Sequence, residues 1–261
     1  IIFENNNEFL NSTKYTQISI FTASVAIFNV FIKESDFNPL SFDVMMGHSL
    51  GEYTALACSK KLPLKDCSLI LKKRGLLMND AVEQNKSGMA AIIGLDAESV
   101  QKIIDDNKID LEIANDNSPI QVVISGDIEE INKNKKIFLE NSIKKFILLN
   151  VSSAFHSKYM KNAEKQLSKE IDKLNFTNNK IKIISNYDSV ISDNNSTIVN
   201  SLKNQMSNQV LWTKNVKKLE EIGEKKIIEI GPGKVLSGLV KRISNNFDIK
   251  SINQISDIIN D

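Results

Sequence analysis

A serine stands between two glycines in the pentapeptide Gly47–Gly51, which spells GHSLG. An apolar run at residues 42–46 precedes it, and a helix-forming run at residues 52–59 follows it. A strand that turns sharply at a serine and continues as a helix is the nucleophile elbow. Both glycines suit that turn, because a Cβ would clash where strand and helix come close. We therefore predict that Ser49 is a nucleophile, with the backbone N–H groups of the helix start available to an oxyanion.

An activated serine needs a base, and the chain has only two histidines, His48 and His156. His48 adjoins the serine, so the elbow should turn its side chain away from the hydroxyl, and we expect a packed or hydrogen-bonded turn residue. His156 is the remaining candidate base, which we expect at a junction between a strand at 151–155 and a helix. No Asp or Glu is singled out by a motif to orient the base, so a backbone carbonyl could serve.

Arg74 is a charged residue on the apolar stripe of a helix that we expect over residues 64–82, opened by Pro63. The stripe consists of Cys67, Ile70, Leu71, Leu77, Met78 and Ala81. A buried unpaired charge is strongly destabilising, so Arg74 needs a partner. It could form a structural ion pair, or reach the surface along its aliphatic stem. Alternatively, its planar fork could bind a carboxylate that arrives with a substrate, and Gly75 beside it would permit close backbone approach.

The remaining pattern predicts an α/β protein with two subdomains. We expect further helices at 16–33, 97–107, 127–141, 160–174, 198–206 and 235–243, and strands at 89–93, 111–115, 121–125, 145–149, 180–185 and 226–230. Residues 87–148 follow the β-α-β-β-α-β order of a ferredoxin-like insertion, with a turn at 116–119. Residues 1–86 and 149–261 would form an α/β-hydrolase-like large subdomain with a mainly parallel sheet. The polar residues 192–196 indicate a surface loop.

Composition narrows the classes of function. The chain has 261 residues, is 41% hydrophobic and 25% charged, and carries a net charge of +1, which argues against a nucleic-acid binder. Cys58 and Cys67 do not make a disulfide framework, and we expect them to be small buried residues. No apolar run has the length needed to cross a bilayer, and the given sequence starts without a basic-then-apolar leader, so we expect no signal peptide and no membrane association.

Several segments together resemble the malonyl-CoA:acyl carrier protein transacylases of fatty acid synthesis. The matching segments are GHSLGEYTALAC at 47–58, an arginine 25 residues after the serine, GMAAIIG at 88–94, AFHS at 154–157, Gln205 with Trp212-Thr213 beyond it, and EIGPGKVL at 229–236. They match in order and spacing, and the resemblance covers essentially the whole chain.

The resemblance implies a role for each matching residue. Ser49 would take malonyl from coenzyme A as an ester and pass it to the phosphopantetheine thiol of acyl carrier protein. His156 would act as base and then as acid, and the main-chain carbonyl of Gln205 would orient it. The backbone N–H of Leu50 would be one oxyanion donor, and Arg74 would hold the free malonyl carboxylate. The residue before the base is Phe155, which in this family accompanies malonyl rather than methylmalonyl.

The resemblance also implies partners and a departure. The partners would be acyl carrier protein and malonyl-CoA, with no metal and no cofactor, and we expect a monomer in the cytoplasm or, alternatively, in a plastid-type organelle. Family members begin with a strand and a Gly-Gln-Gly-rich loop whose glutamine is the second oxyanion donor. Ile1 starts beyond that segment, so we expect an N-terminally truncated chain, in which the loss of one donor would lower the rate on the order of 10²–10³.

Two other functions fit parts of the pattern. A serine hydrolase, such as a thioesterase, would use the same elbow, but α/β-hydrolases place their histidine late in the chain, after the acid. Here about a hundred residues follow His156, and a simple ester gives a buried arginine no use. A non-catalytic docking module for acidic carrier proteins would need a basic surface, for which Lys241 and Arg242 are candidates, although a solvated helix face is the simpler interpretation.

Overall fold

The computed structural model describes residues 12–35, 37–83 and 86–259, so Ile1, on which the expected truncation rests, lies outside the described residues. In chain order the elements are α2 (Thr13–Glu34), η1 (Pro39–Ser41), β1 (Val44–Met45), α3 (Leu50–Cys58), α4 (Leu64–Asn79), β2 (Ser87–Ile93), α5 (Ala97–Asp106), β3 (Leu111–Ser118), β4 (Gln121–Asp127), α6 (Ile128–Glu140), β5 (Lys145–Leu148), η2 (Lys158–Met160), α7 (Lys161–Ile171), β6 (Lys182–Ile184), β7 (Ile191–Ser192), α8 (Asn195–Lys203), α9 (Trp212–Glu221), β8 (Lys226–Ile230), α10 (Val235–Ile243), β9 (Asp248–Ile252) and α11 (Ser256–Ile259). The predicted mixed α/β class is confirmed.

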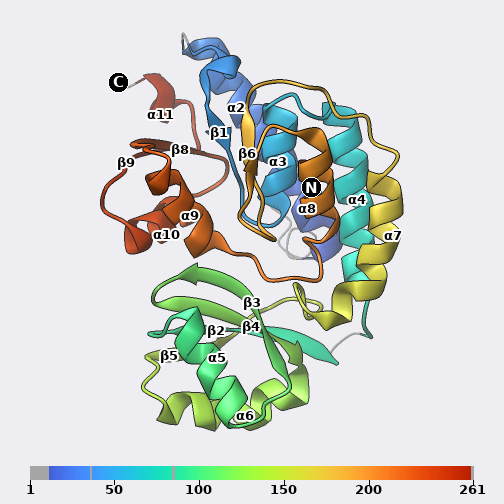
Figure 1. Ribbon diagram of the computed structural model, residues 1–261, viewed down its shortest axis with the longest axis vertical. Helices are drawn as coiled ribbons and strands as arrows, with labels where there is room; N and C mark the ends of the chain where they lie inside the picture. The colour runs from blue at the N-terminus through green and yellow to red at the C-terminus, as the bar shows by residue number, and fades with distance from the viewer. Residues whose placement is uncertain (1–11, 36, 84–85, 260–261) are drawn as a thin grey trace.

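Strands β2 to β5 form one antiparallel sheet at one end of the molecule (Figure 1). Its order is β3-β4-β2-β5, and α5 and α6 connect its strands, so the predicted β-α-β-β-α-β succession is present. Successive side chains of a strand point to opposite faces. Ala90 and Ile92 therefore pack with the two helices, whereas Met89 and Ala91 belong to a second cluster on the other face, with Phe155 against it.

The turn between β3 and β4 differs from the expectation of a turn at residues 116–119. β3 continues to Ser118 and β4 begins at Gln121, so only Pro119 and Ile120 lie between them. Two register irregularities in β3, on either side of the Asn115–Asp116 step, accommodate its polar residues. A bulge of this kind bends a strand without ending it, which is why turn-forming residues lie inside β3.

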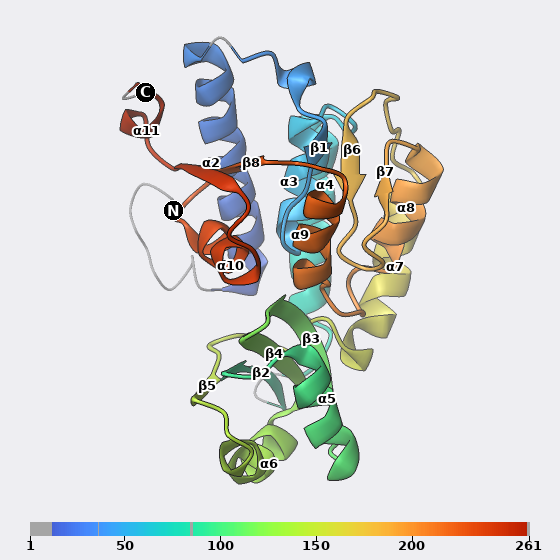
Figure 2. The same cartoon turned by 60° about the vertical axis from the view of Figure 1, so that its left-hand side comes forward.

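The rest of the described chain contains two small sheets rather than one large one. One has the order β1-β6-β7, and the other pairs β8 with β9. The β1–β6 and β8–β9 pairings are parallel and the β6–β7 pairing is antiparallel. Two of the three described pairings are therefore parallel, but the single continuous sheet that we expected is divided. Figure 2 shows α2 and α10 on one side of β1, β6 and β7, and α7 and α8 on the other.

Helix α2 corrects the statement that no apolar run could cross a bilayer. It has 22 residues, and its length and composition satisfy that criterion. A core helix of a globular protein satisfies it too, and α2 packs against α3 and α4 with Phe21 and Val25 in the hydrophobic core.

The close approach predicted at Gly75 is confirmed, because a Cβ there would lie 3.2 Å from the carbonyl oxygen of Thr13.

Several boundaries differ from the predicted ones. Helix α4 ends at Asn79, and the segment 149–157 is irregular, so His156 does not follow a strand directly. The expected loop at 192–196 contains the end of β7 and the start of α8, because Asn194 caps this helix with a side-chain oxygen that accepts from Thr197 N. Strand β8 is half-buried. Besides the short η1 and η2, the described part of the chain contains four elements that were not predicted: β7, α9, β9 and α11.

Candidate active site

The elbow at Ser49 has the strained geometry that its sequence predicts. Strand β1 ends at Met45, α3 begins at Leu50, and Ser49 between them has φ 51° and ψ −107°. A Cβ on Gly47 would lie 2.1 Å from the carbonyl carbon of Gly51, so this glycine is required. The expectation that Gly51 is required in the same way was wrong, because nothing lies within 4 Å of a Cβ built there. Ser49 precedes a helix, yet its hydroxyl makes no capping hydrogen bond and remains available for chemistry.

His156 lies beside this hydroxyl. The distance from Ser49 Oγ to His156 Nε2 is 2.8 Å. On the other side of the ring, Nδ1 lies 3.1 Å from the carbonyl oxygen of Gln205 and 3.2 Å from that of Asn208. Two carbonyl acceptors require a proton on Nδ1, which leaves Nε2 free to accept the proton of Ser49. The Gln205 carbonyl thus lies where the resemblance implied, and Asn208 adds a second one that sequence reasoning missed.

Burial keeps the imidazole neutral. His156 is 4% exposed. Burial, and then the charge of Arg74 and the neighbouring His48, lower the pKa of His156 to about 3. A neutral imidazole is the form that can act as a base, so His156 is in the required protonation state at neutral pH. It also has positive φ, 56°, like Ser49, so both residues of this pair stand on strained backbone.

Arg74 completes the contacts of the serine hydroxyl. The guanidinium is 1% exposed, and its Nη2 donates to Ser49 Oγ over 3.0 Å. Nη2 also donates to Gln205 Oε1 over 3.0 Å, and Nη1 donates to Gln17 Oε1 over 2.6 Å. Within the described chain Arg74 forms no salt bridge, and its Nε has no hydrogen-bond partner. Neither the surface-reaching side chain nor the structural ion pair that we considered is present, which leaves a buried cation beside the nucleophile.

Comparison with known proteins identifies the family. The family described as acyl transferase domain matches residues 1–261. The chain belongs to this family. It is 37% identical over 247 residues to the malonyl CoA-acyl carrier protein transacylase of Bacillus subtilis, a match that covers 94% of this chain and 77% of that protein.

Solved structures of related proteins share the fold of this acyltransferase. An acyl carrier protein S-malonyltransferase from Vibrio cholerae has a TM-score of 0.90 at 35% identity, over 96% of this chain and 82% of that one. A malonyl-transacylase in complex with its type II polyketide acyl carrier protein has a TM-score of 0.92 at 34% identity, over 98% and 82% of the two chains. The similarity in fold and the similarity in sequence both extend over nearly the whole acyltransferase.

Asn186 is a residue of the acyltransferase site that sequence reasoning missed. Its side-chain oxygen accepts from Ser49 N–H over 2.6 Å, and its side-chain nitrogen donates to the Gly47 carbonyl over 2.8 Å. Both bonds fix the backbone of the elbow, at Ser49 and at Gly47. The one signal in the sequence was position, because Asn186 follows the strand β6 at its carboxyl end, where functional side chains collect in parallel sheets.

Gln17 and Tyr53 were also missed, and both contact Arg74. Gln17 lies on α2, accepts from the guanidinium, and directs its own amide nitrogen toward the Met78 sulfur at 3.3 Å. The centre of the Tyr53 ring lies 5.5 Å from the guanidinium carbon, an arrangement that favours a cation over an aromatic face. A polar residue on an apolar helix was the available signal for Gln17.

The remaining predicted site residues lie close by. Leu50 is the first residue of α3, and within the described chain its backbone N–H has no hydrogen-bond acceptor, as befits a helix start. Phe155 packs against two hydrophobic clusters, one that contains Leu56 and one that contains Met89. His48 is a hydrogen-bonded turn residue, as expected, with Nε2 2.7 Å from Asn117 Oδ1.

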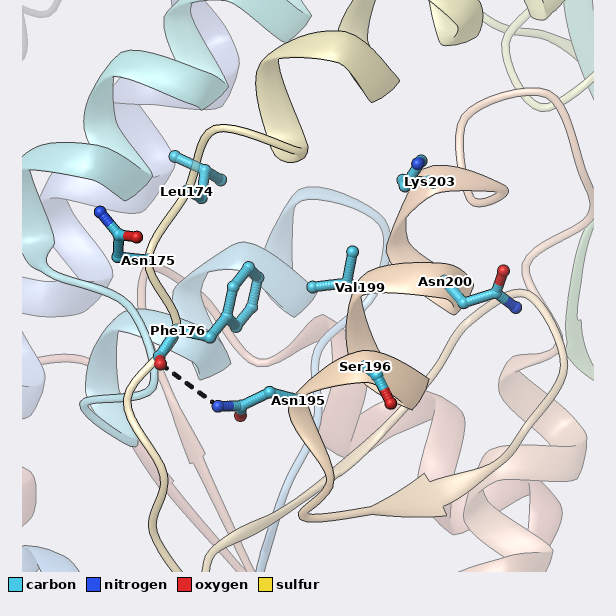
Figure 3. Close-up of a pocket in the computed structure, with 8 residues that line it drawn as sticks. All are labelled: Leu174, Asn175, Phe176, Asn195, Ser196, Val199, Asn200 and Lys203. Atoms are coloured by element: carbon cyan, nitrogen blue, oxygen red, sulfur yellow. Dashed lines mark hydrogen bonds between the residues drawn. The ribbon is translucent and has the colours of Figure 1, made fainter.

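Other predicted or possible sites are separate from this one. Cys67 is buried and Cys58 half-buried, both are free, and burial raises the pKa of each thiol to about 12. No group of three or more His, Cys, Asp or Glu side chains that could hold a metal occurs in the described residues. A surface hollow of about 440 Å³ lies between the segment 174–176 and α8, and no residue of the elbow lines it. Figure 3 shows the side chains that line it.

Proposed function

We propose that this acyltransferase moves malonyl from malonyl-CoA to the phosphopantetheine thiol of acyl carrier protein, and the names of its relatives, which give malonyl CoA and acyl carrier protein, support this. The single observation that carries the proposal is that Ser49 Oγ touches a neutral imidazole and a buried guanidinium at once. A nucleophile with a base is common to acyl transfer in general. The cation without a carboxylate partner adds selectivity for an acyl group that carries its own carboxylate.

The first half-reaction loads the enzyme. Ser49 Oγ attacks the thioester carbonyl carbon of malonyl-CoA while His156 Nε2 takes the hydroxyl proton. The resulting oxyanion accepts a hydrogen bond from the free N–H of Leu50, which is one donor of the oxyanion hole. Collapse breaks the carbon–sulfur bond, and His156 returns its proton to the departing CoA sulfur. The products are malonyl-Ser49 ester and free CoA, so every proton is accounted for within the pair.

The second half-reaction unloads it. The carrier's phosphopantetheine thiol gives its proton to His156 Nε2, and its sulfur attacks the ester carbonyl. When the ester bond breaks, His156 protonates Ser49 Oγ and restores the resting site. The carbonyls of Gln205 and Asn208 keep the proton on Nδ1 throughout, which is the role of the carboxylate in other triads. No step needs a cofactor, and we propose that none is used.

Arg74 and Phe155 would select the acyl group. The guanidinium would hold the malonyl carboxylate beside the atom that becomes the ester oxygen. Phe155 adjoins the base and would limit space at the carbon between the two carbonyl groups, so that methylmalonyl fits less well. Support for this comes from the packing of Phe155 between two hydrophobic clusters, which leaves its ring little freedom to move.

The division of the chain and its location are further proposals. We propose that residues 87–148 form a small subdomain inserted into a large one made of residues 1–86 and 149–261. In support, the β2–β5 sheet has a hydrophobic cluster of its own, around Ile92 and Phe138. We propose a cytoplasmic location, because the named relatives are bacterial proteins whose names give malonyl groups and acyl carrier protein as what they act on.

Intact mass spectrometry after brief incubation with malonyl-CoA tests the proposal. The wild-type chain should gain the mass of one malonyl group and lose it when holo acyl carrier protein is added, while Ser49→Ala should gain nothing. Labelling of Ser49→Ala at the wild-type level would refute the assignment. A serine hydrolase would instead release CoA rapidly whether or not the carrier is present, so omission of the carrier separates the two activities.

A further inference from the structure

Glu52 is a carboxylate buried beneath the elbow, and its position in the sequence suggests a different role from the one it has. It lies three residues after Ser49, the S-x-x-E spacing of a helix capping box. A capping box would direct the Glu52 carboxylate to Ser49 N–H. In the structure that N–H donates to Asn186, and the Ser49 hydroxyl caps nothing. Glu52 is 1% exposed and points elsewhere, so helix capping does not account for it.

One oxygen of Glu52 receives two hydrogen bonds from the site. Gln205 Nε2 donates to Glu52 Oε2 over 2.8 Å, and Asn186 N–H donates to the same atom over 3.1 Å. Asn186 is the residue that holds the elbow, and Gln205 is the residue whose carbonyl holds His156. Glu52 therefore connects Asn186, which holds the backbone of the nucleophile, with Gln205, whose carbonyl holds the base.

The contact with Gln205 also determines which end of its amide faces Arg74. Gln205 Nε2 donates to both Glu52 Oε2 and the Ser49 carbonyl, which lies 3.0 Å away. Its oxygen, Oε1, is thereby turned toward Arg74 Nη2. A flipped amide would set its NH₂ group against the guanidinium donors and its oxygen against a carboxylate, and both contacts would be repulsive.

The charges reinforce this order. Arg74 is a buried cation with no salt bridge among the described residues, and an isolated buried charge is costly. Glu52 lies one residue removed, with the amide of Gln205 between the two, and its ionised form offsets the charge of Arg74. Burial raises the pKa of Glu52 to about 7, and the hydrogen bonds from Gln205 and Asn186 and the charge of Arg74 act against that rise.

We propose that Glu52 is a positioning residue for malonyl recognition, which fixes the Gln205 amide so that Arg74 keeps its fork beside Ser49. The inference rests on the proposed malonyl transfer and adds a residue to its selectivity. Glu52 touches neither substrate nor reacting atom. Its effect should therefore appear in the preference for malonyl over acetyl, and it should depend on the side chain of Gln205.

A double-mutant cycle tests this, with Glu52→Ala, Gln205→Ala and the double variant, each loaded with malonyl-CoA and with acetyl-CoA. The main-chain carbonyl of Gln205 survives its substitution. Each single variant should lower kcat/KM for malonyl-CoA roughly ten- to a hundredfold, mainly through KM, because a hydrogen bond to a charged group is lost. Loading with acetyl should change less than about threefold, and the double variant should match the worse single one.

Conservative and control variants complete the experiment. Glu52→Gln keeps an acceptor oxygen and should recover malonyl selectivity to within about threefold of wild type. Glu98→Ala, which removes an exposed glutamate from the first turn of α5, should leave both substrates unchanged. If Glu52→Ala melts below the assay temperature, Glu52→Met, of similar volume, replaces it with the same expectations.

Two outcomes would overturn the inference. Equal losses with malonyl and acetyl would mean that Glu52 only supports the fold, and multiplicative losses in the double variant would mean that it does not act through Gln205. The proposed function is judged separately, by whether the wild-type chain is loaded by malonyl-CoA at all. A loaded wild type with unaltered selectivity in the variants refutes the role of Glu52 alone.

Discussion

Arg74 Nη2 donates a hydrogen bond to Ser49 Oγ over 3.0 Å in the unliganded site. The residue proposed to bind the carboxylate thus already touches the atom proposed to attack the thioester. Because Gln17 and Gln205 hold the two ends of the fork, the guanidinium is oriented before substrate arrives. Such preorganisation lowers the entropy lost on binding and stabilises negative charge as it develops on the serine oxygen.

Replacing Arg74 should separate malonyl from acetyl. Arg74→Met keeps the volume of the buried stem and removes the charge, and we expect kcat/KM for malonyl-CoA to fall about 10- to 100-fold, with a much smaller loss for acetyl-CoA. Arg74→Lys should recover little, because an ammonium lacks the fork. Lys73→Ala, an exposed neighbour on α4, is the control. Steady-state loading assays with both substrates measure this, and equal losses would make Arg74 purely structural.

Removal of the base should slow both half-reactions. Among the described residues, Ser49 Oγ has hydrogen bonds only with His156 and Arg74, and an arginine cannot accept a proton. His156→Ala should therefore slow acyl-enzyme formation by about 10²–10⁴, measured by quenched-flow mass spectrometry. The variant should remain folded in thermal melts. A loss smaller than about tenfold would show that another group takes the proton.

Activity should persist at acidic pH. Burial and the charge of Arg74 lower the pKa of His156 from 6.5 to about 3, so the ring stays unprotonated as the pH falls below neutrality. The acid limb of kcat/KM, which reports groups in the free enzyme, should accordingly lie below pH 5 rather than near 6.5. A pH series in constant ionic strength measures the limb. An apparent pKa near the ordinary value would mean that His156 is hydrated in solution.

Glu52 and His156 should make the stability of the fold depend on pH in opposite directions. The pKa of Glu52 is raised from 4.5 to about 7, so between these values the folded state binds more protons than the unfolded chain. Stability is then lost as the pH rises through this window, whereas the lowered pKa of His156 makes stability fall as the pH drops. Glu52→Gln removes one contribution only. Its stability relative to wild type, from urea unfolding at several pH values, should increase from pH 4.5 to pH 7; a constant difference would contradict the raised pKa.

The two glycines of the pentapeptide should tolerate alanine differently. A Cβ on Gly47 would overlap the backbone of Gly51, and backbone cannot move aside cheaply, so Gly47→Ala should lower stability by about 3 kcal/mol or prevent folding. Gly51 has open space at that position and lies in α3, where alanine favours the helix by about 0.5–1 kcal/mol. Thermal melts of the two variants measure this. Comparable melting temperatures would contradict the geometry.

Local signals in the sequence were enough to predict the residues that stand out chemically. The elbow follows from glycines around a serine, and Arg74 from a charge on an apolar stripe. His156 follows from a count of histidines. The first two signals each lie in one short segment, the third is a count over the chain, and all three are independent of the fold. The four-stranded sheet was likewise predictable, because its short strand and helix segments follow one another in the β-α-β-β-α-β order of a ferredoxin-like unit.

The supporting residues could not be predicted in the same way. Asn186 contacts Ser49 across 137 residues of sequence, and Asn208 contacts His156 through a main-chain atom that any residue possesses. Amides carry no charge, so their presence in a core leaves no anomaly as clear as that of Arg74. For Glu52 the local signal was misleading, since its spacing from Ser49 predicts a helix cap and the fold directs the carboxylate to Gln205 instead.

Ser49 and His156, which the proposed chemistry requires, both have positive φ angles that lower the stability of the fold. Each departs from the backbone that side chains prefer, at a cost of about 1–3 kcal/mol, and glycine at either position would relieve it. An engineering search scored on melting temperature alone is therefore drawn toward the two residues that the chemistry requires. Lys108 and Ser142 have positive φ as well and lie in the β2–β5 part of the chain, away from the elbow. Glycine at those two positions gains the same relief without a trade-off.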